Sequence, residues 1–230
     1  MSKKTSIIDG ILLGLTGVFM LVSIYAIFLY APIEKSMQSG GVAQKIFYFH
    51  LPLALLCFLA FFIVFVASIA YLYTKHGMWD RVAYSAAEVG IIFCTLVLIT
   101  GSIWGKSTWN VWWTWDPRLT TVMILWCMYV AYLMLRKMLE PGSQMLNIVS
   151  VFGIISFINV PITFMAIRMW RTIHPVVIDK EGVHISPPML HTLLLNFAAF
   201  TLLFVVLLRM RVRIEGTEQI SQELELALEE

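Results

Sequence analysis

The sequence predicts an all-α, polytopic membrane protein: one bundle of six transmembrane helices with a tryptophan-rich loop on its outer face. Hydrophobic residues make up 60% of the 230 residues and charged residues 13%, whereas soluble domains have about 45–50% and about 25%. The apolar residues fall into six runs, each near the length of about 20 residues that a helix needs to cross a bilayer. The short alternating segments of a membrane β-barrel are not seen in them.

The six runs are joined by short connections, so we expect residues 1–213 to form a single membrane domain. The runs are Ile11–Tyr30, Leu51–Tyr73, Val82–Ile103, Leu119–Leu135, Leu146–Ile167 and Met189–Leu208. Each is predicted to be helical because a helix pairs its own backbone N–H and C=O groups inside lipid. Residues 214–230 are rich in glutamate and are predicted to form an acidic, solvated cytoplasmic tail.

Two of the runs need separate arguments. The first follows Lys3 and Lys4, as in a signal peptide, but it is longer than a signal-peptide core and no small-residue cleavage pattern follows it. We therefore interpret it as the first spanning helix. The fifth run contains Asn159 and Pro161, which predict a kink, because proline removes a helical hydrogen bond.

An even number of helices places both termini on the same side of the membrane. Lys and Arg are somewhat more frequent in the loops on the side of the termini than in the loops on the other side. Because cytoplasmic loops carry an excess of Lys and Arg, we expect cytoplasmic termini in a bacterial inner membrane. Residues 31–45, 104–118 and 168–188 would then form the periplasmic face.

Tryptophan is concentrated in the second of these outer segments. Five of the eight tryptophans of the chain lie there: Trp104, Trp109, Trp112, Trp113 and Trp115. Tryptophans also gather in belts at membrane interfaces, but a belt is spread over all helix ends. A local group offers a broad apolar surface with N–H groups at its edge, so we favour a platform for a large planar ligand.

The same segment resembles the WWD signature of haem-handling proteins of cytochrome c assembly, a superfamily that includes the CcmC, CcmF and CcsA types. The matching residues are Trp104, Gly105, Trp109, Trp112, Trp113, Trp115, Asp116, Arg118, Leu119 and Thr120. A chain of 230 residues with six helices and one such loop is similar to the CcmC type along nearly its whole length. The resemblance implies that the loop at 104–118 holds haem, with haem b as the cofactor.

Histidine is the usual ligand for haem iron at an exposed site. His50, at the outer start of the second run, lies in a K-I-x-Y-x-H-x-P segment, and His174 lies in a W-x-T-x-H segment. Both segments resemble those that carry the axial ligands in CcmC-type proteins, although Pro175 departs from the pattern. His191, and after it His184, are the alternatives to His174. His76 is predicted to lie on the opposite side and is excluded.

Four cations on the outer side are candidates to pair with haem propionates: Lys106, Arg118, Arg168 and Arg171. Arginine binds a carboxylate through two parallel hydrogen bonds, but cations at a membrane boundary commonly only extend toward water. Arg118 is favoured because it belongs to the motif. Asp116 belongs to the motif too, yet its simpler role is to cap the fourth helix, with Pro117 in the first turn.

The three cysteines, Cys57, Cys94 and Cys127, lie in apolar runs without CxxC spacing, so we interpret them as buried small hydrophobic residues and not as a zinc or disulfide framework. Glu88 is the one carboxylate inside a predicted span. Ionisable residues in a span are functional candidates, and we interpret Glu88 as a proton site, a contact to a partner subunit or a neutral acid.

The resemblance implies a membrane haem carrier that delivers haem to a CcmE-type haem chaperone, with a CcmD-type small membrane protein and a CcmA–CcmB-type ABC transporter as partners. No general acid or base has a convincing position, so a carrier is favoured over a classical enzyme. The alternatives are a CcsA-type cytochrome c synthase subunit and a small proton-coupled transporter that uses Glu88. The sequence has no Lys/Arg tract of the kind that follows nucleic acid.

Overall fold

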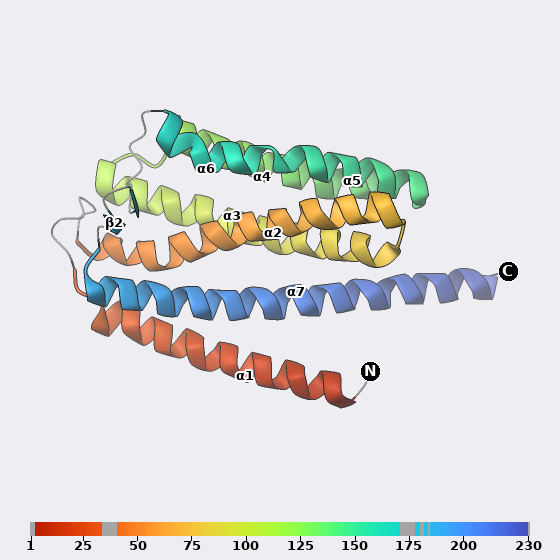
Figure 1. Cartoon of the computed structure of the whole chain (residues 1–230), viewed down its shortest axis with the longest axis horizontal. Coiled ribbons are helices and arrows are strands. Elements are labelled where there is room, and N and C mark those ends of the chain that lie inside the picture. Colours follow the sequence, from red (N-terminus) through yellow and green to blue (C-terminus); the bar gives the residue numbers. More distant parts are fainter. Residues whose placement is uncertain (1–2, 34–40, 171–177, 180–181, 184, 230) are drawn as a thin grey trace.

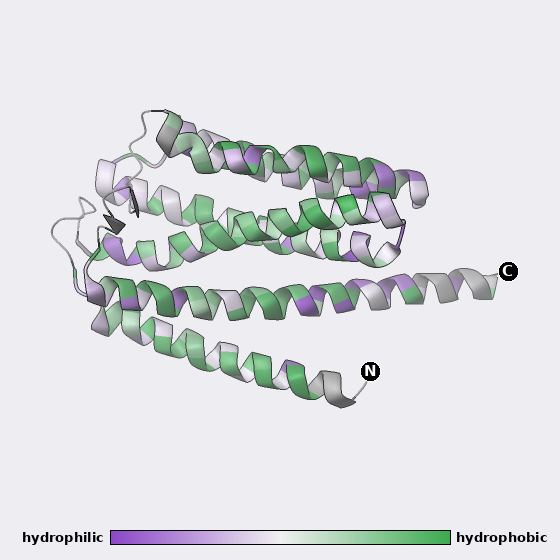
Figure 2. Ribbon diagram, viewed as in Figure 1, coloured by the Kyte–Doolittle hydropathy of each residue, from purple (hydrophilic) through white to green (hydrophobic). Residues whose placement is uncertain are grey.

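The computed structural model describes residues 3–33, 41–170, 178–179, 182–183 and 185–229. Its helices lie roughly along one long axis, and both chain ends are found at the same end of the bundle (Figure 1). Six helical segments in the described residues are long and apolar enough to cross a membrane. The predicted all-α membrane bundle is therefore confirmed, and most of its surface along the spans is apolar (Figure 2).

The elements of the described residues are helices and one pair of short strands. They are α1 (Lys3–Tyr25), a π-helical turn (Ala26–Tyr30), a 3-10 helix (Gly41–Ile46), α2 (Phe47–Thr74), α3 (Gly77–Trp109), α4 (Pro117–Met138), α5 (Ser143–Phe157), α6 (Asn159–Met169), β1 (Ile178–Asp179), β2 (Gly182–Val183) and α7 (Pro187–Glu229). The strands β1 and β2 pair in an antiparallel arrangement.

The fifth span is divided into α5 and α6, as the sequence predicts. Pro161 has no N–H and its ring displaces the carbonyl four residues earlier, which is that of Phe157, the last residue of α5. The helix is interrupted at the next residue, where the backbone N–H of Ile158 bonds to the carbonyl of Ile155 at 3.1 Å. The two helices together still form one membrane span.

The core of the bundle is the contact between α2 and α3, which α4, α5 and α7 cover. The helices approach closely at Gly90 of α3, where an added Cβ would lie 2.6 Å from the ring of Phe61 on α2. The ring of Phe61 also stacks on Tyr129 of α4, with ring centroids 3.6 Å apart. Helix α1 lies outside this core and packs along α7.

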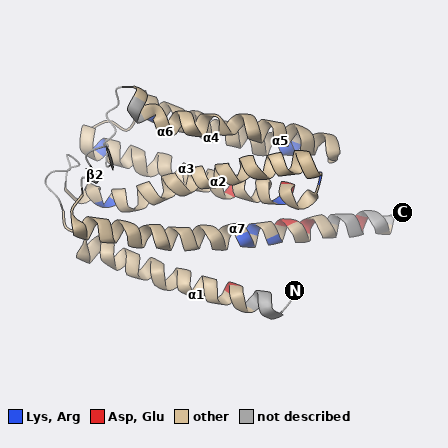
Figure 3. Ribbon diagram, in the orientation of Figure 1, with Lys and Arg blue, Asp and Glu red and all other residues tan. Residues whose placement is uncertain are grey.

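Helix α7 is much longer than the predicted run at Met189–Leu208, and it continues through most of the predicted tail. The start of this tail is not simply solvated, because Glu215 is buried and faces Arg136 and Arg211. Gly216 gives room for Arg81, whose Nη1 would lie 2.7 Å from a Cβ at that position. Charged residues accordingly gather on α7 at the end of the bundle that carries the termini (Figure 3).

Candidate functional site

A pocket with an empty volume of about 700 Å³ lies between α2, α3 and α4, toward the end of the bundle away from both termini. We call it the Trp pocket. Three tryptophans, a histidine, an arginine and mostly apolar side chains line it: His50, Ala54, Cys57, Phe58, Cys94, Val97, Leu98, Gly101, Ser102, Trp104, Trp109, Trp113, Arg118, Leu119 and Val122. A large apolar cavity with a few polar groups is the usual form of a ligand site.

His50 lies in the first turn of α2, and its ring is held by α3. Its Nδ1 is 2.9 Å from Oγ1 of Thr100. The Thr100 hydroxyl donates its own proton to the carbonyl of Leu96, at 2.7 Å, so its oxygen accepts a hydrogen bond from His50 Nδ1–H. This hydrogen bond selects the neutral tautomer with the proton on Nδ1 and the lone pair on Nε2, which is the form that ligates a metal.

The ring of His50 is also fixed by its neighbours on α3. It meets Trp104 edge to face, with ring centroids 6.1 Å apart and an angle of 76° between the planes. A Cβ at Gly101 would lie 3.2 Å from Cε1 of His50, so this position accepts only glycine without a shift of the ring. Thr100, Gly101 and Trp104 together position His50 in the wall of the pocket.

The segment 104–118 is only partly a loop, which corrects the prediction. Helix α3 continues to Trp109 and ends at Asn110, whose φ of 59° is left-handed. Lys106 secures this end, because its Nζ donates to the Asn110 carbonyl at 3.2 Å and to Oδ1 at 2.7 Å. The loop therefore spans only residues 110–116, and Lys106 is not among the residues that line the pocket.

The five tryptophans of this segment divide into two groups. Trp104, Trp109 and Trp113 line the Trp pocket. Trp112 and Trp115 are instead 60% and 74% exposed, and Trp115 contacts the edge of Trp113 with ring centroids 6.1 Å apart. One group thus forms a wall of the cavity, and the other forms an aromatic surface beside it.

The start of α4 completes the pocket with a cation. Asp116 is the N-cap residue, and its Oδ1 accepts a hydrogen bond from the backbone N–H of Arg118 at 3.0 Å. Pro117 follows at the first helical position, as the sequence predicts. The cap fixes the direction in which α4 leaves the loop, and Arg118 lies in the pocket wall.

Several predicted site residues fall outside this geometry. Arg171, His174 and His184 and the side chain of Arg168 lie outside the described residues. His191 on α7 is 3.4 Å from the Tyr30 hydroxyl and does not line the Trp pocket. His76 caps the start of α3 at the opposite end of the bundle, the side on which the sequence predicts it.

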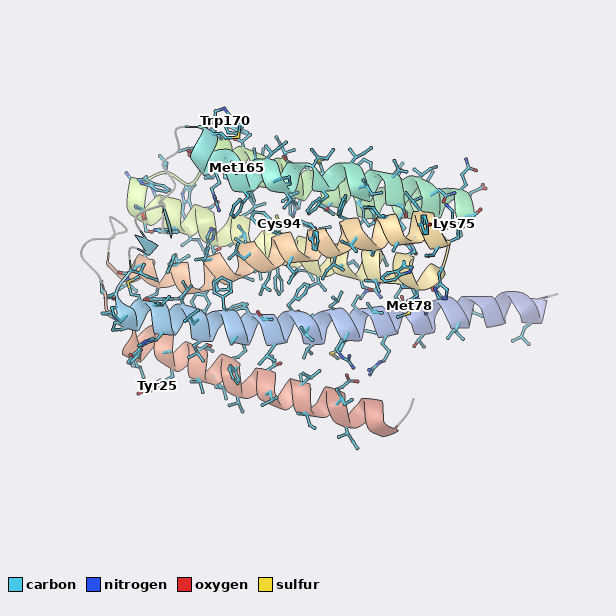
Figure 4. All side chains as sticks on the ribbon, viewed as in Figure 1. Tyr25, Lys75, Met78, Cys94, Met165 and Trp170 are labelled. Atoms are coloured by element: carbon cyan, nitrogen blue, oxygen red, sulfur yellow. The ribbon has the colours of Figure 1, made fainter. Side chains whose placement is uncertain are left out.

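The three cysteines differ in burial, which their sequence context did not predict. Cys57 and Cys94 are buried, as predicted, and their side chains contact each other in the wall of the Trp pocket. Cys94 lies on α3 in the interior of the bundle (Figure 4). Cys57 follows His50 by seven residues on the same face of α2, a spacing that a helical wheel reveals. The predicted burial of Cys127 is wrong, because it is exposed on α4, where a lipid-facing position suits a small apolar side chain.

Glu88 has a charged partner within the chain. It forms an ion pair with Arg211 of α7, and Arg211 also contacts Glu215 at 3.2 Å. Glu88 lies six residues before Cys94 on α3 and is not among the residues that line the Trp pocket. Glu88 therefore has an internal partner and belongs to the contact between α3 and α7.

Comparison with known proteins agrees with the architecture. The model of the family CcmC, heme exporter protein C, matches residues 2–226. Heme exporter protein C of Bradyrhizobium diazoefficiens is 35% identical over 169 residues, 73% of this chain and 64% of that protein. Heme exporter protein C of Rhodobacter capsulatus is 31% identical over 192 residues, 82% of this chain and 78% of that protein.

The chain is also similar to a plant protein. A putative cytochrome c biosynthesis ccmC-like mitochondrial protein of Marchantia polymorpha is 32% identical over 187 residues, which is 81% of this chain and 79% of that protein. The family match extends over all six membrane spans of the chain. The chain therefore belongs to the CcmC family, heme exporter protein C.

Proposed function

We propose that this multi-pass membrane protein binds haem in the Trp pocket and hands it on during the maturation of c-type cytochromes. The observation that carries the proposal is the oriented imidazole of His50 in an aromatic cavity. The names of the relatives, heme exporter protein C and cytochrome c biosynthesis protein, support the same role.

The residues of the pocket match the chemistry of haem. The macrocycle is flat and apolar, and the tryptophans and aliphatic side chains of the pocket offer it an apolar surface. The iron needs axial ligands, and Nε2 of His50 is the nitrogen that the Thr100 hydrogen bond leaves with a lone pair. The propionates need cations, and Arg118 lies in the same wall.

We propose His174 as the second axial ligand, on the basis of its W-x-T-x-H segment. It belongs to the connection between α6 and β1, and α6 ends at Met169 toward the same end of the bundle as the Trp pocket. His191 is a weaker candidate, because its Nδ1 faces the hydroxyl of Tyr30 away from the residues that line the pocket.

We propose that the receiving protein docks on the aromatic surface beside the pocket. Trp112 and Trp115 are exposed there, next to the wall formed by Trp113. A CcmE-type haem chaperone would take the haem at this surface, and a CcmD-type protein and a CcmA–CcmB-type transporter would complete the assembly. In this arrangement the chain acts as a carrier of haem b, with cytoplasmic termini and a periplasmic pocket.

The absorption spectrum of the detergent-purified protein tests the proposal. We expect a Soret band in the wild type that shifts or fades in His50→Ala and in His174→Ala, and that persists in His76→Ala. His76 is a matched control because it is also a histidine at a helix start, at the opposite end of the bundle. A wild type that stays colourless with added haem, or a double variant with a normal Soret band, would contradict the proposal.

A further inference from the structure

A second cavity lies between α1 and α7, near the end of the bundle that carries both termini. Its empty volume is about 470 Å³, and it is lined by residues between 9 and 13 of α1 and between 206 and 213 of α7. We call it the α1–α7 hollow. A Cβ added at Gly10 would meet no atom within 4 Å, so the wall at this point is open and not filled by side chains.

Three charged side chains meet in this hollow. Nη2 of Arg209 is 3.2 Å from Oδ1 of Asp9, and Arg213 pairs with the other oxygen of the same carboxylate. Two guanidinium groups thus share one carboxylate, which leaves a net charge of +1. The side chains of Arg209, Arg213 and Asp9 are 42%, 34% and 24% exposed, so an ion outside the protein can reach the group.

The depth of this charged group is set by the sequence. Asp9 is the last charged residue before the uncharged run Gly10–Tyr30, and Arg209 is the first Lys, Arg, Asp or Glu of α7. Both uncharged runs are about as long as the helix of about 20 residues that fills a bilayer core. Asp9 and Arg209 therefore lie where the core ends and the lipid headgroups begin.

We propose that the α1–α7 hollow binds the phosphate headgroup of an anionic phospholipid. A guanidinium has five N–H donors in a planar fork that suits phosphate, and Arg209 directs only its Nε and Nη2 at Asp9. Leu12, Leu13 and Met210 line the hollow beside the charges, and they offer an apolar surface to the glycerol end of the acyl chains. Basic pockets between helices at this depth are the usual sites of such headgroups.

Lipid retention measures this site directly and independently of haem. The full chain is reconstituted in nanodiscs of equal phosphatidylglycerol and phosphatidylcholine, transferred to detergent, and its retained lipids are counted by mass spectrometry. We expect preferential retention of phosphatidylglycerol. Each of Arg209→Gln and Arg213→Gln should lower that retention roughly fivefold. Lys137→Gln is the matched control, since it removes an exposed cation at the same end of the bundle, on α4.

The variant Asp9→Asn distinguishes two roles of Arg209 and Arg213: binding of a lipid headgroup, and a purely structural ion pair with Asp9. If the arginines serve a headgroup, removal of the competing carboxylate raises the net charge of the hollow and should increase phosphatidylglycerol retention. If they serve only to hold α1 against α7, Asp9→Asn should lower retention together with the arginine variants, and the proposal is overturned. Equal retention of both lipids, or displacement of phosphatidylglycerol by millimolar inorganic phosphate, overturns it as well.

Discussion

His50 of α2 and Thr100 of α3 are joined by a hydrogen bond in which the threonine oxygen is the acceptor. Oγ1 of Thr100 is 2.9 Å from Nδ1 of His50, while its hydroxyl proton is directed to the carbonyl of Leu96. Because its hydroxyl proton is bound to the backbone of its own helix, Thr100 presents a fixed hydrogen-bond acceptor to His50. Partners of this kind hold the tautomer and the ring orientation of a metal-binding histidine.

Thr100→Val should weaken haem binding about 10-fold or more, the usual effect of removing a partner that orients a metal ligand. Valine keeps the shape of threonine but cannot accept the hydrogen bond, so the neutral ring is no longer held in one tautomer. A haem titration followed at the Soret band measures the affinity. Thr100→Ser keeps the acceptor and should restore binding, and equal affinities of the valine variant and the wild type would refute the positioning role.

Gly101→Ala should impair haem binding without unfolding the bundle. The new Cβ would lie 3.2 Å from Cε1 of His50, which is tight enough to turn the ring away from the pocket, although alanine favours the helix itself by about 0.5–1 kcal/mol. The Soret position and intensity report the ring, and a thermal unfolding curve in detergent reports the fold. Gly14→Ala is the control, because its Cβ meets nothing within 4 Å.

The membrane spans and the cap at Asp116 are predictable from sequence because they depend on local signals: apolar length, and an N-cap residue before a proline. The extension of α3 to Trp109 was missed because tryptophan and the polar residues 106–108 do not mark a helix inside lipid. Thr100 and Gly101 were missed because their importance comes from His50, fifty residues away in the chain. The internal partner of Glu88 was missed for the same reason, since Arg211 is 123 positions away.

Gly90→Leu should destabilise the bundle, because the position on α3 has no room for a side chain against α2. Even a Cβ would lie 2.6 Å from the ring of Phe61, and Phe61 cannot move away because it is stacked on Tyr129. Overpacking of a core typically costs about 1–3 kcal/mol. Chemical unfolding in detergent measures the loss, and Gly14→Leu on the open side of α1 should change the free energy of unfolding far less.

Two carboxylates of α3, Asp80 and Glu88, form ion pairs, and their neutralisation should lower the free energy of unfolding by different amounts. Asp80 is 3% exposed and binds Arg136 through two hydrogen bonds of 2.6 Å, so Asp80→Asn leaves a buried guanidinium without its main partner. Loss of one member of a buried pair costs about 3–5 kcal/mol.

Glu88→Gln should cost much less than Asp80→Asn, because the partner of Glu88 keeps other carboxylates. Arg211 retains Glu215 at 3.2 Å and Glu218 at 3.5 Å, and the side chains of Glu88 and Arg211 are 26% and 23% exposed. Chemical unfolding measures the difference, and the Soret band of Glu88→Gln should match that of the wild type. A normal Soret band with abolished cytochrome c maturation would instead favour Glu88 as a proton site, because Glu88 does not line the Trp pocket and the loss of one of several ion pairs of Arg211 gives no reason for that result.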